Sequence, residues 1–357
     1  MTHRIIETEL IDISMPLRQP YVIAYETITH APNLLLRLET DNGLIGYGCA
    51  APDRAVGGET PDSVRTGFRS VVEPLLHRAD ASRVHYWMDE LRTQIADQPA
   101  LLAMVNMALY DLLAQRAGLP IYELLGAYRR SIPTSITIGI CSVAETLAEG
   151  KRWQHAGFSI YKIKGGHSVE LDVERLARFR ETFGAAIQLR FDANQGYTVE
   201  ETLRFIRMTE NYGLEILEQP TPKTDLQKLG AVTHQSDLPV MADESLMNLG
   251  DAFRIARSGL ANMLNIKLMK VGGITHAAHI NSVAKAAGME VMVGCMDECA
   301  LGICSGLHFA LAYPNVRYAD LDGHLDLLDD PTAGCFRLEA GILYPKAEAG
   351  WGFGGLG

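Results

Sequence analysis

Three carboxylates recur at a regular spacing in the second half of this chain. Asp192, Glu218 and Asp243 lie 26 and 25 residues apart, each at the end of a short apolar run. Carboxylates that are brought together repel one another unless a cation neutralises them. Oxygen ligands favour a hard ion such as Mg²⁺, with water and substrate filling its remaining positions. The spacing therefore predicts a Mg²⁺ site made by these three residues.

Two lysines flank the carboxylates in the chain. Lys164 precedes them and Lys267 follows them, each at the end of another apolar run. A lysine close to a metal ion and to another ammonium group has a lowered pKa and can act as a base. A substrate carboxylate bound to the metal would have one lysine on each face of its α-carbon. We therefore expect α-proton transfer through an enediolate that the metal stabilises.

Lys162 lies two residues before Lys164, so the two side chains share a face if the segment is a strand. We expect Lys162 to lower the pKa of Lys164 and to help hold the enediolate charge. The alternative is that these lysines lie at the surface and that each carboxylate pairs with a neighbouring Lys or Arg. Two lysines facing inward and three acids on consecutive runs are hard to explain in that way.

Eight apolar runs, about 25 residues apart, carry these residues, and helix-like stretches separate them. Such runs are typical of parallel strands that crossover helices bury on both faces. Eight such units close into a barrel, with the active site at the C-terminal ends of the strands. The runs centre near Ile138, Ile163, Arg190, Leu217, Met241, Ile266, Val293 and Tyr318. The reactive residues are thus predicted to meet at one mouth of the barrel.

The first part of the chain has a different pattern. Three strands, with a hairpin turn at Asp41–Gly43, precede three helices; the strands are Ile5–Met15, Asn33–Thr40 and Leu44–Gly48, and the helices cover 61–79, 82–96 and 98–118. The predicted fold class is α/β, a modified TIM barrel (β/α)7β with an N-terminal α+β capping domain that the C-terminal tail completes. We expect a capping domain over 1–130, a catalytic barrel over 131–324, and an irregular tail over 325–357. Arg18–Thr29 and Cys49–Thr60 are candidate lid loops.

Composition restricts the class of protein. The chain has 357 residues, of which 47% are hydrophobic and 21% charged, as in soluble globular proteins. Its net charge of −11 argues against a nucleic-acid partner. The six cysteines form no C-x-x-C pair, the N-terminus has no apolar signal segment, and no run is long enough to span a membrane. We expect a cytoplasmic protein with no membrane partner.

The strand-end motifs together resemble those of the enolase superfamily, in its muconate-lactonising subgroup. They are Lys162-x-Lys164, Asp192-Ala-Asn, Glu218-Gln-Pro, Ala242-Asp-Glu-Ser and Asn265-Ile-Lys-Leu-Met-Lys-x-Gly-Gly. The resemblance extends over nearly the whole chain. It implies that Lys164 and Lys267 are the acid/base lysines, that the three carboxylates bind Mg²⁺, and that the chain forms a homo-oligomer.

The end of the eighth run narrows the resemblance to dipeptide epimerases. Asp320-Leu-Asp322 resembles the Asp-x-Asp pair that holds the free α-ammonium group of a dipeptide in that family. Carboxylates are the partners that a buried ammonium group needs. The alternative for this pair is an ion pair at the end of the barrel. Thr137 aligns with a threonine that contacts the substrate, and Cys295 is a further candidate contact.

Three acidic residues indicate the preferred side chain of the substrate. Ala-Glu epimerases of the family place an arginine at the position that corresponds to Glu26 in this chain, so an acidic substrate would be repelled. Asp297 stands where many relatives have an apolar residue, and Asp53 adds a carboxylate from a lid loop. These residues predict dipeptides that contain Lys or Arg. The alternative is that Glu26 and Asp53 are solvated loop charges.

The leading interpretation is therefore an isomerase, a Mg²⁺-dependent dipeptide epimerase that works by 1,1-proton transfer at the α-carbon of the C-terminal residue. Alternatives on the same scaffold are an Ala-Glu epimerase, an N-acylamino-acid racemase, an o-succinylbenzoate synthase or a muconate cycloisomerase. The substrates of the last three enzymes lack the ammonium group that Asp320 and Asp322 would hold. A barrel without catalytic activity would be expected to lack a lysine or a metal ligand, and all are present.

Overall fold

The fold was examined in a computed structural model, which describes residues 3–23 and 26–356; for residues 19–23 and 26–28 only the backbone is described. Eight parallel strands follow one another around the barrel in chain order. They are β5 (Ile136–Ile138), β6 (Ile160–Lys164), β7 (Gln188–Asp192), β8 (Leu214–Glu218), β9 (Val240–Ala242), β10 (Met263–Lys267), β11 (Glu290–Gly294) and β12 (Val316–Asp320). Every predicted strand centre lies within one of them. The bridge between Thr134 and Ala319 joins the two ends of the sheet.

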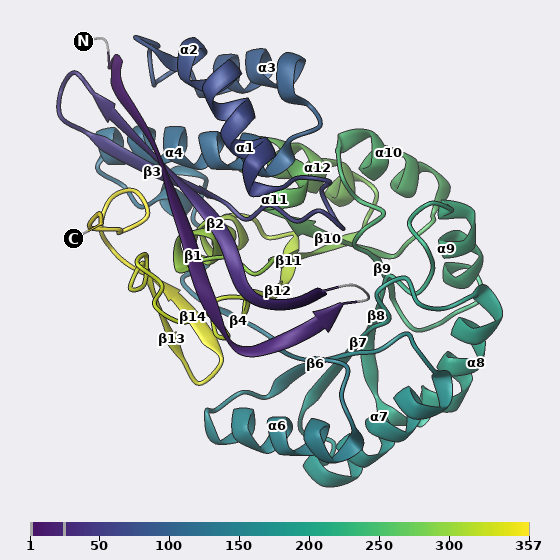
Figure 1. Ribbon diagram of the computed structural model, residues 1–357. Helices are drawn as coiled ribbons and strands as arrows, with labels where there is room; N and C mark the ends of the chain where they lie inside the picture. Colours follow the sequence, from purple (N-terminus) through teal and green to yellow (C-terminus); the bar gives the residue numbers. More distant parts are fainter. Residues whose placement is uncertain (1–2, 24–25, 357) are drawn as a thin grey trace.

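Helices surround the barrel, as the crossover pattern predicted (Figure 1). They are α6 (Val143–His155), α7 (Val169–Phe183), α8 (Val199–Thr209), α9 (Leu226–Thr233), α10 (Leu249–Ser258), α11 (Leu268–Val271), α12 (Ile274–Ala286) and α13 (Ala300–Ala312). Capping boxes begin three of them. At α8, for example, Thr198 and Glu201 each accept a backbone N–H of the other, which satisfies two amides at the helix start. The helix starts are therefore encoded locally.

The capping domain contains one antiparallel sheet and a group of helices. Its strands are β1 (Ile5–Ile23), β2 (Glu26–Thr40) and β3 (Ile45–Ala50). Its helices are α1 (Pro61–Gly67), the π-helix η1 (Phe68–Val72), α2 (Glu73–Leu76), α3 (Val84–Ile95), α4 (Pro99–Ala117) and α5 (Ile121–Leu124). The outer face of β3 is packed so closely on α4 that a Cβ on Gly46 would lie 2.6 Å from Leu112 Cγ. This contact fixes the sheet on the longest helix of the domain.

The prediction that Arg18–Thr29 is a lid loop is wrong for most of this segment. Strands β1 and β2 continue through it as a hairpin, with Tyr21 opposite Ile28 and Ile23 opposite Glu26. Its β-branched and aromatic residues favour a strand over a loop. Figure 1 shows the hairpin extending from the capping domain over the barrel. The segment that approaches the barrel is therefore a two-stranded ribbon.

The C-terminal tail is more regular than expected. Strands β13 (Phe336–Glu339) and β14 (Ile342–Pro345) form a small sheet with β4 (Ile132–Pro133), so the prediction of an irregular tail is wrong here. Beyond them Trp351 is buried, and its indole Nε1 donates to the carbonyl of Tyr47 at 2.9 Å. The backbone N–H of Trp351 donates to Asp111 on α4 at 3.2 Å. The tail thus contacts both β3 and α4.

The pKa of Asp111 gives a testable pH dependence of stability. Burial raises it from the ordinary 3.8 to about 7, although the amides of Tyr47 and Trp351 partly offset this. The folded state therefore binds the proton more tightly than the unfolded state. The contribution of Asp111 to the free energy of unfolding is therefore fully present below about pH 4. It decreases as the pH rises from there to about 7, by about 1.4 kcal/mol per pH unit.

We expect the melting temperature of Asp111→Asn to depend less on pH than that of the wild type between pH 4 and 7. Thermal melts at constant ionic strength measure this difference. The matched control is Asp62→Asn, because the Asp62 side chain is 92% exposed. If Asp111→Asn and Asp62→Asn have the same pH dependence, Asp111 does not titrate in this range.

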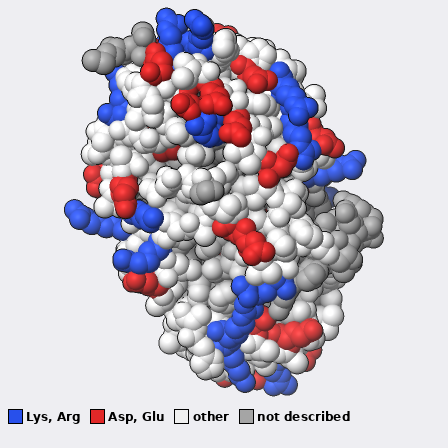
Figure 2. Space-filling view, turned by 60° about the vertical axis from the view of Figure 1, so that its left-hand side comes forward, with Lys and Arg blue, Asp and Glu red and all other residues white. Residues whose placement is uncertain are grey.

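Surface charge is evenly distributed on the face shown in Figure 2, where acidic and basic side chains alternate with uncharged surface. Such a face lacks the strong field of one sign that would steer a charged macromolecule. Of the described helices, none has the length and apolar character to cross a membrane. The charged residues that bear on function are instead those at the mouth of the barrel.

Candidate active site

The C-terminal ends of the barrel strands bring the predicted lysines and carboxylates to one mouth. Lys164 on β6 pairs in register with Asp192 on β7, which pairs with Glu218 on β8. Asp243 directly follows β9, and Lys267 is the last residue of β10. The three carboxylates are almost fully buried, at 1%, 2% and 1% exposure. They thus occupy the arc of the mouth between the two lysines.

Lys162 lies inside the barrel, among the carboxylates. Its Nζ is 3.9 Å from Asp192 Oδ2 and 3.8 Å from Glu218 Oε2, and it forms an ion pair with Asp320. Burial opposes the charged form of Lys162, but the carboxylates of Asp320, Glu218 and Asp192 outweigh it and hold the pKa of Lys162 well above its usual range. Lys162 is therefore a fixed positive charge in the site.

Lys267 is held by the carboxylate of Asp243. The distance from Lys267 Nζ to Asp243 Oδ2 is 2.8 Å, and Lys270 forms a second ion pair with Asp243. Burial disfavours the charge of Lys267, but Asp243 outweighs it and raises the pKa of Lys267. This differs from the lowered pKa expected of a lysine base. The protein groups alone favour the protonated form of Lys267 because its ammonium group faces the carboxylate of Asp243.

The donor set fits a hard cation. Burial raises the pKa of Glu218 well above its usual range; Lys162 offsets part of this effect, and Asp192 and Asp243 add to it. A positive ion would relieve this repulsion between oxygen donors. Among the residues that the structure describes, no three such side chains are already close enough to form a ready metal cage. The ammonium group of Lys162 lies between two of the donors instead.

Several residues to which the sequence analysis assigned no role hold the carboxylates in place. Asn265 Nδ2 donates to Glu218 Oε1 at 2.7 Å, and the backbone N–H of Asn194 donates to Asp192 Oδ1 at 2.9 Å. Gln219 accepts the backbone N–H of Asp243 at 3.0 Å. Asn194, Gln219, Asn265 and Lys270 all belong to the quoted strand-end motifs. Their place within three residues of a proposed ligand or base was the signal that could have identified them.

Comparison with known proteins shows the family to which this chain belongs. The family described as mandelate racemase / muconate lactonizing enzyme, N-terminal domain, matches residues 5–126, and the enolase C-terminal domain-like family matches residues 145–354. An L-Lys-D/L-Arg epimerase of Desulforapulum autotrophicum is 42% identical over 95% of this chain and 96% of its own length. This chain belongs to the dipeptide epimerases of the enolase superfamily. It is therefore an isomerase.

Solved structures of dipeptide epimerases have the same fold. The L-Ala-D/L-Glu epimerase from Bacillus subtilis, in a substrate-liganded complex, is 35% identical with a TM-score of 0.96, over 99% of each chain. The dipeptide epimerase from Methylococcus capsulatus, complexed with Mg and the dipeptide L-Arg-D-Lys, is 38% identical with a TM-score of 0.92. That match covers 98% of this chain and 99% of the other. The predicted fold class is confirmed.

The two aspartates expected from the dipeptide epimerase motif differ in their surroundings. Asp320 is buried, paired with Lys162, and accepts the Ser135 hydroxyl at 2.6 Å. Asp322 accepts the backbone N–H of Thr137 at 2.6 Å. Burial and the charge of Asp320 raise the pKa of Asp322 to about 6. A bound cation would thus be stabilised more by Asp322 than by Asp320, because Lys162 already neutralises the charge of Asp320.

The remaining candidate contacts are spread around the mouth. Cys295 Sγ lies 4.0 Å from Asp322 Oδ1 and accepts the backbone N–H of Gly323 at 3.3 Å. Asp297 is exposed in the loop after β11, and its carbonyl accepts from Asn33 of β2 at 3.0 Å. Glu26 begins β2, but its side chain lies outside the described residues. The structure therefore brings Cys295 and Asp322 together and does not show where the Glu26 side chain points.

The second lid loop is held by hydrogen bonds near its middle. Asp53 Oδ1 accepts the backbone N–H groups of Ala55 and Val56 at 2.7 and 2.9 Å, which closes a local turn. The carbonyls of the same two residues accept from Lys223 Nζ, in the loop after β8, at 3.2 and 3.4 Å. Asp53 therefore shapes the loop with one carboxylate oxygen. These local hydrogen bonds favour the alternative that Asp53 is a loop charge that does not contact the substrate, although the alternative as first stated was a solvated charge.

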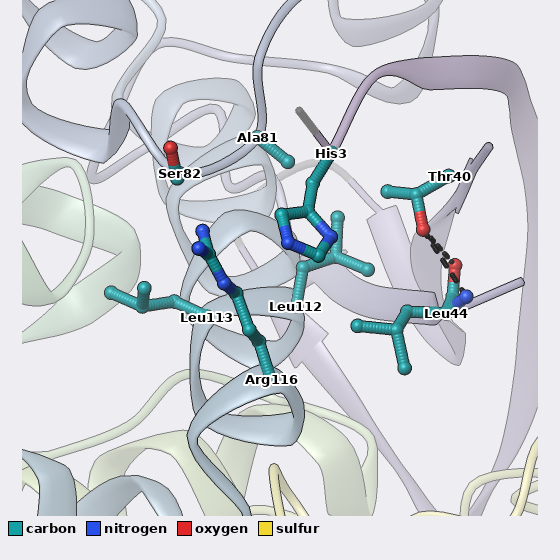
Figure 3. A pocket seen from close by; sticks show the side chains of 8 residues that line it. All are labelled: His3, Thr40, Leu44, Ala81, Ser82, Leu112, Leu113 and Arg116. Atoms are coloured by element: carbon teal, nitrogen blue, oxygen red, sulfur yellow. Dashed lines mark hydrogen bonds between the residues drawn. The ribbon is translucent and has the colours of Figure 1, made fainter. Parts of the chain in front are cut away.

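Figure 3 shows a small cavity whose lining residues all belong to the capping domain. Its volume is about 10 Å³, which is room for one water molecule. The side chains around it come from β2, the turn before β3, α4 and the segments before β1 and α3. They are His3, Thr40, Leu44, Ala81, Ser82, Leu112, Leu113 and Arg116. The cavity is too small for a dipeptide and is unrelated to the mouth of the barrel.

Proposed function

We propose that this protein is a Mg²⁺-dependent epimerase of dipeptides that acts by 1,1-proton transfer at the α-carbon of the C-terminal residue. The observation that supports it most is the order of groups around the mouth. Lys164 ends β6 and Lys267 ends β10, and the carboxylates Asp192, Glu218 and Asp243 lie at the C-terminal ends of the three strands between them. An α-carbon centred over these carboxylates has a proton donor and acceptor on each side.

Each lysine takes one of two roles in the proposed reaction. The neutral amine of one removes the α-proton from one face, and the ammonium group of the other returns a proton to the opposite face. The direction of epimerisation decides which is which. Lys162 remains charged and places an ammonium group where negative charge develops on the substrate carboxylate. Asp322, supported by Asp320 and Thr137, holds the free α-ammonium group of the dipeptide.

The proposed ligands of Mg²⁺ are Asp192, Glu218 and Asp243. When bound there, Mg²⁺ supplies the positive charge that stabilises the substrate carboxylate after its α-proton leaves. A ligand that binds only the folded state also stabilises that state, by about 2.7 kcal/mol at a hundredfold excess over its Kd. We expect EDTA to abolish activity and Mg²⁺ to raise the melting temperature of the chelated protein.

The control for this expectation is Glu218→Gln, which keeps the size of the side chain and removes one charged donor. Its melting temperature should rise much less with Mg²⁺ than that of the wild type. Melts without Mg²⁺ and with Mg²⁺ at about a hundred times its Kd for the wild type measure both proteins. An equal rise in both would exclude Glu218 as a ligand.

We further propose that the preferred dipeptides carry a cationic side chain, Lys or Arg. The similarity to an L-Lys-D/L-Arg epimerase and to a structure that contains L-Arg-D-Lys supports this preference. Asp297 at the mouth, and Glu26 at the start of β2, are the carboxylates proposed to attract the cation. Asp53 is the weakest of these candidates because its Oδ1 closes a turn. The competing substrate is Ala-Glu, the substrate class named for the Bacillus subtilis structure.

A screen of pooled L,L-dipeptides and, separately, of N-succinyl amino acids in D₂O with Mg²⁺ tests these proposals by mass spectrometry. Epimerisation incorporates one deuterium at the α-carbon, so each substrate is identified by its mass. Fastest labelling of Lys- and Arg-containing dipeptides is the expected result. Faster labelling of Ala-Glu would refute the cationic preference and retain the chemistry. Labelling of N-succinyl amino acids alone would refute the dipeptide epimerase.

We also propose the division into a capping domain (1–130), a barrel (131–324) and a tail (325–357). From the family resemblance alone we propose a homo-oligomer. The unpaired cysteines support the proposal of a cytoplasmic location. Light scattering coupled to size-exclusion chromatography tests the oligomer. A monomer at micromolar concentration would contradict it.

A further inference from the structure

The two proposed acid/base lysines are held in different ways. Lys267 Nζ forms an ion pair with Asp243 at 2.8 Å, so a contact at the ammonium group itself sets its direction. Lys164 forms no ion pair within 4.0 Å among the described residues, and its side chain is only partly buried. The direction of the Lys164 ammonium group therefore depends mainly on the backbone from which the side chain extends.

A buried arginine fixes that backbone. Arg175 on α7 is 3% exposed, and its Nη1 donates to the carbonyl of Lys164 at 2.6 Å. Its Nη2 donates to the carbonyl of Gly139, just after β5, at 2.6 Å, and its Nε donates to the Thr146 hydroxyl at 3.0 Å. The planar guanidinium thus joins the ends of β5 and β6. Its fixed fork of donors makes this possible, and the single ammonium group of lysine does not reproduce it.

Asp172, one helical turn before Arg175, holds the guanidinium and the chain beyond Lys164. Its Oδ1 accepts from Arg175 Nη1 at 3.3 Å. Its Oδ2 accepts the backbone N–H of Gly166 at 2.9 Å and the hydroxyl of Tyr197 at 2.7 Å. Buried polar groups that satisfy one another in this way resist displacement. The network therefore fixes the backbone both at Lys164 and two residues after it.

The glycines at this corner allow little movement. A Cβ on Gly165 would lie 2.6 Å from Asp172 Cγ, and a Cβ on Gly166, whose φ is +102°, would clash with the carbonyl of Ala193. The end of β6 is thus packed between α7 and the loop that follows β7. If Arg175 is lost, the carbonyl of Lys164 loses its donor while the surrounding packing remains.

We propose that Arg175 is the positioning residue for Lys164, whose carbonyl it holds so that the ammonium group meets one face of the substrate α-carbon. This inference rests on the proposed function and adds a residue to it. Arg175 acts through the backbone and is not itself a catalytic residue. Because Asp243 sets the direction of Lys267, loosening Arg175 is expected to weaken proton transfer on the Lys164 face and to spare the other face.

The test compares the two faces separately. An L,L-dipeptide and its L,D-epimer are incubated in D₂O with Mg²⁺, and loss of the α-proton is followed by NMR. Lys164→Ala first identifies the epimer whose exchange needs Lys164. In Arg175→Met, exchange of that epimer should fall about 10- to 100-fold in kcat, since a misplacement of about 1 Å costs on that order. Exchange of the other epimer, and the KM values, should stay within about threefold of the wild type.

Arg178→Met is the matched control, because Arg178 lies on the same helix, is exposed, and pairs only with Glu181 among the described ion pairs. It should leave both exchange rates unchanged. Two milder variants serve if Arg175→Met does not fold. Arg175→Lys should restore part of the rate, and Tyr197→Phe, which removes one donor to Asp172, should show the same asymmetry to a smaller extent.

Equal loss for both epimers, or no loss, in folded Arg175 and Tyr197 variants would overturn the inference. A merely structural role would produce equal loss, since it would disturb the whole mouth. Failure of the proposed function looks different, because the wild type would then exchange the α-proton of neither epimer.

Discussion

Lys164→Ala and Lys267→Ala are each expected to abolish epimerisation while keeping exchange of one α-proton with solvent. The remaining lysine still removes the proton from its own face and returns a deuteron to that face, so the configuration is retained. The lost lysine leaves the opposite face without an acid or base. General acid–base groups contribute roughly 10²–10⁴-fold, so the rate of epimerisation should fall by about that factor or more.

Two measurements on the same samples check this result. Chiral chromatography follows epimerisation, and NMR in D₂O follows α-proton exchange, starting from each epimer in turn. The matched control is Lys228→Ala, because Lys228 is exposed on α9 and its recorded ion pair is with Asp225. Retention of more than about a tenth of the wild-type epimerisation would exclude the altered lysine as an acid or base.

Asp322→Asn is expected to reduce kcat/KM for free dipeptides by about 10²- to 5 × 10³-fold. In the proposed complex Asp322 is the buried partner of the dipeptide ammonium group, and removal of one partner of a buried ion pair costs about 3–5 kcal/mol. Asparagine keeps an oxygen that accepts the backbone N–H of Thr137, so the loop retains its anchor. Asp320 is a poorer choice because its replacement would also release Lys162.

An N-acetylated dipeptide serves as the control substrate because it has no ammonium group. It should be a poor substrate for the wild type and no worse for Asp322→Asn. The difference between the two substrates isolates the charge interaction, as in a double-mutant cycle. The same loss on both substrates would mean that Asp322 supports the loop and does not bind the amine.

Local signals were sufficient for most of the fold. The apolar runs of the barrel strands are separated by capped amphipathic helices, and all eight predicted centres lie in strands of one parallel sheet. The hairpin through Arg18–Thr29 was missed because Pro20 and polar residues interrupt its pattern. Strands β13 and β14 were missed because each has only four residues, and their pairing with β4 joins distant parts of the chain.

In the candidate site, too, some features could be predicted from the sequence and others needed the fold. The types of Lys164, Lys267 and the three carboxylates, and their places at strand ends, are visible in the sequence. The ion pair between Lys162 and Asp320 joins residues 158 positions apart. Arg175 looks like an ordinary helix residue, and only the fold shows that its guanidinium reaches the ends of two strands.

The sequence by itself determined the order of strands and helices and the chemical groups at each strand end, because both depend on residue type and short-range periodicity. Only the tertiary structure determined which lysine forms an ion pair with which carboxylate. Burial and distance together set the pKa values of Lys267, Glu218 and Asp322. Neither quantity exists until the barrel closes and brings β5 beside β12.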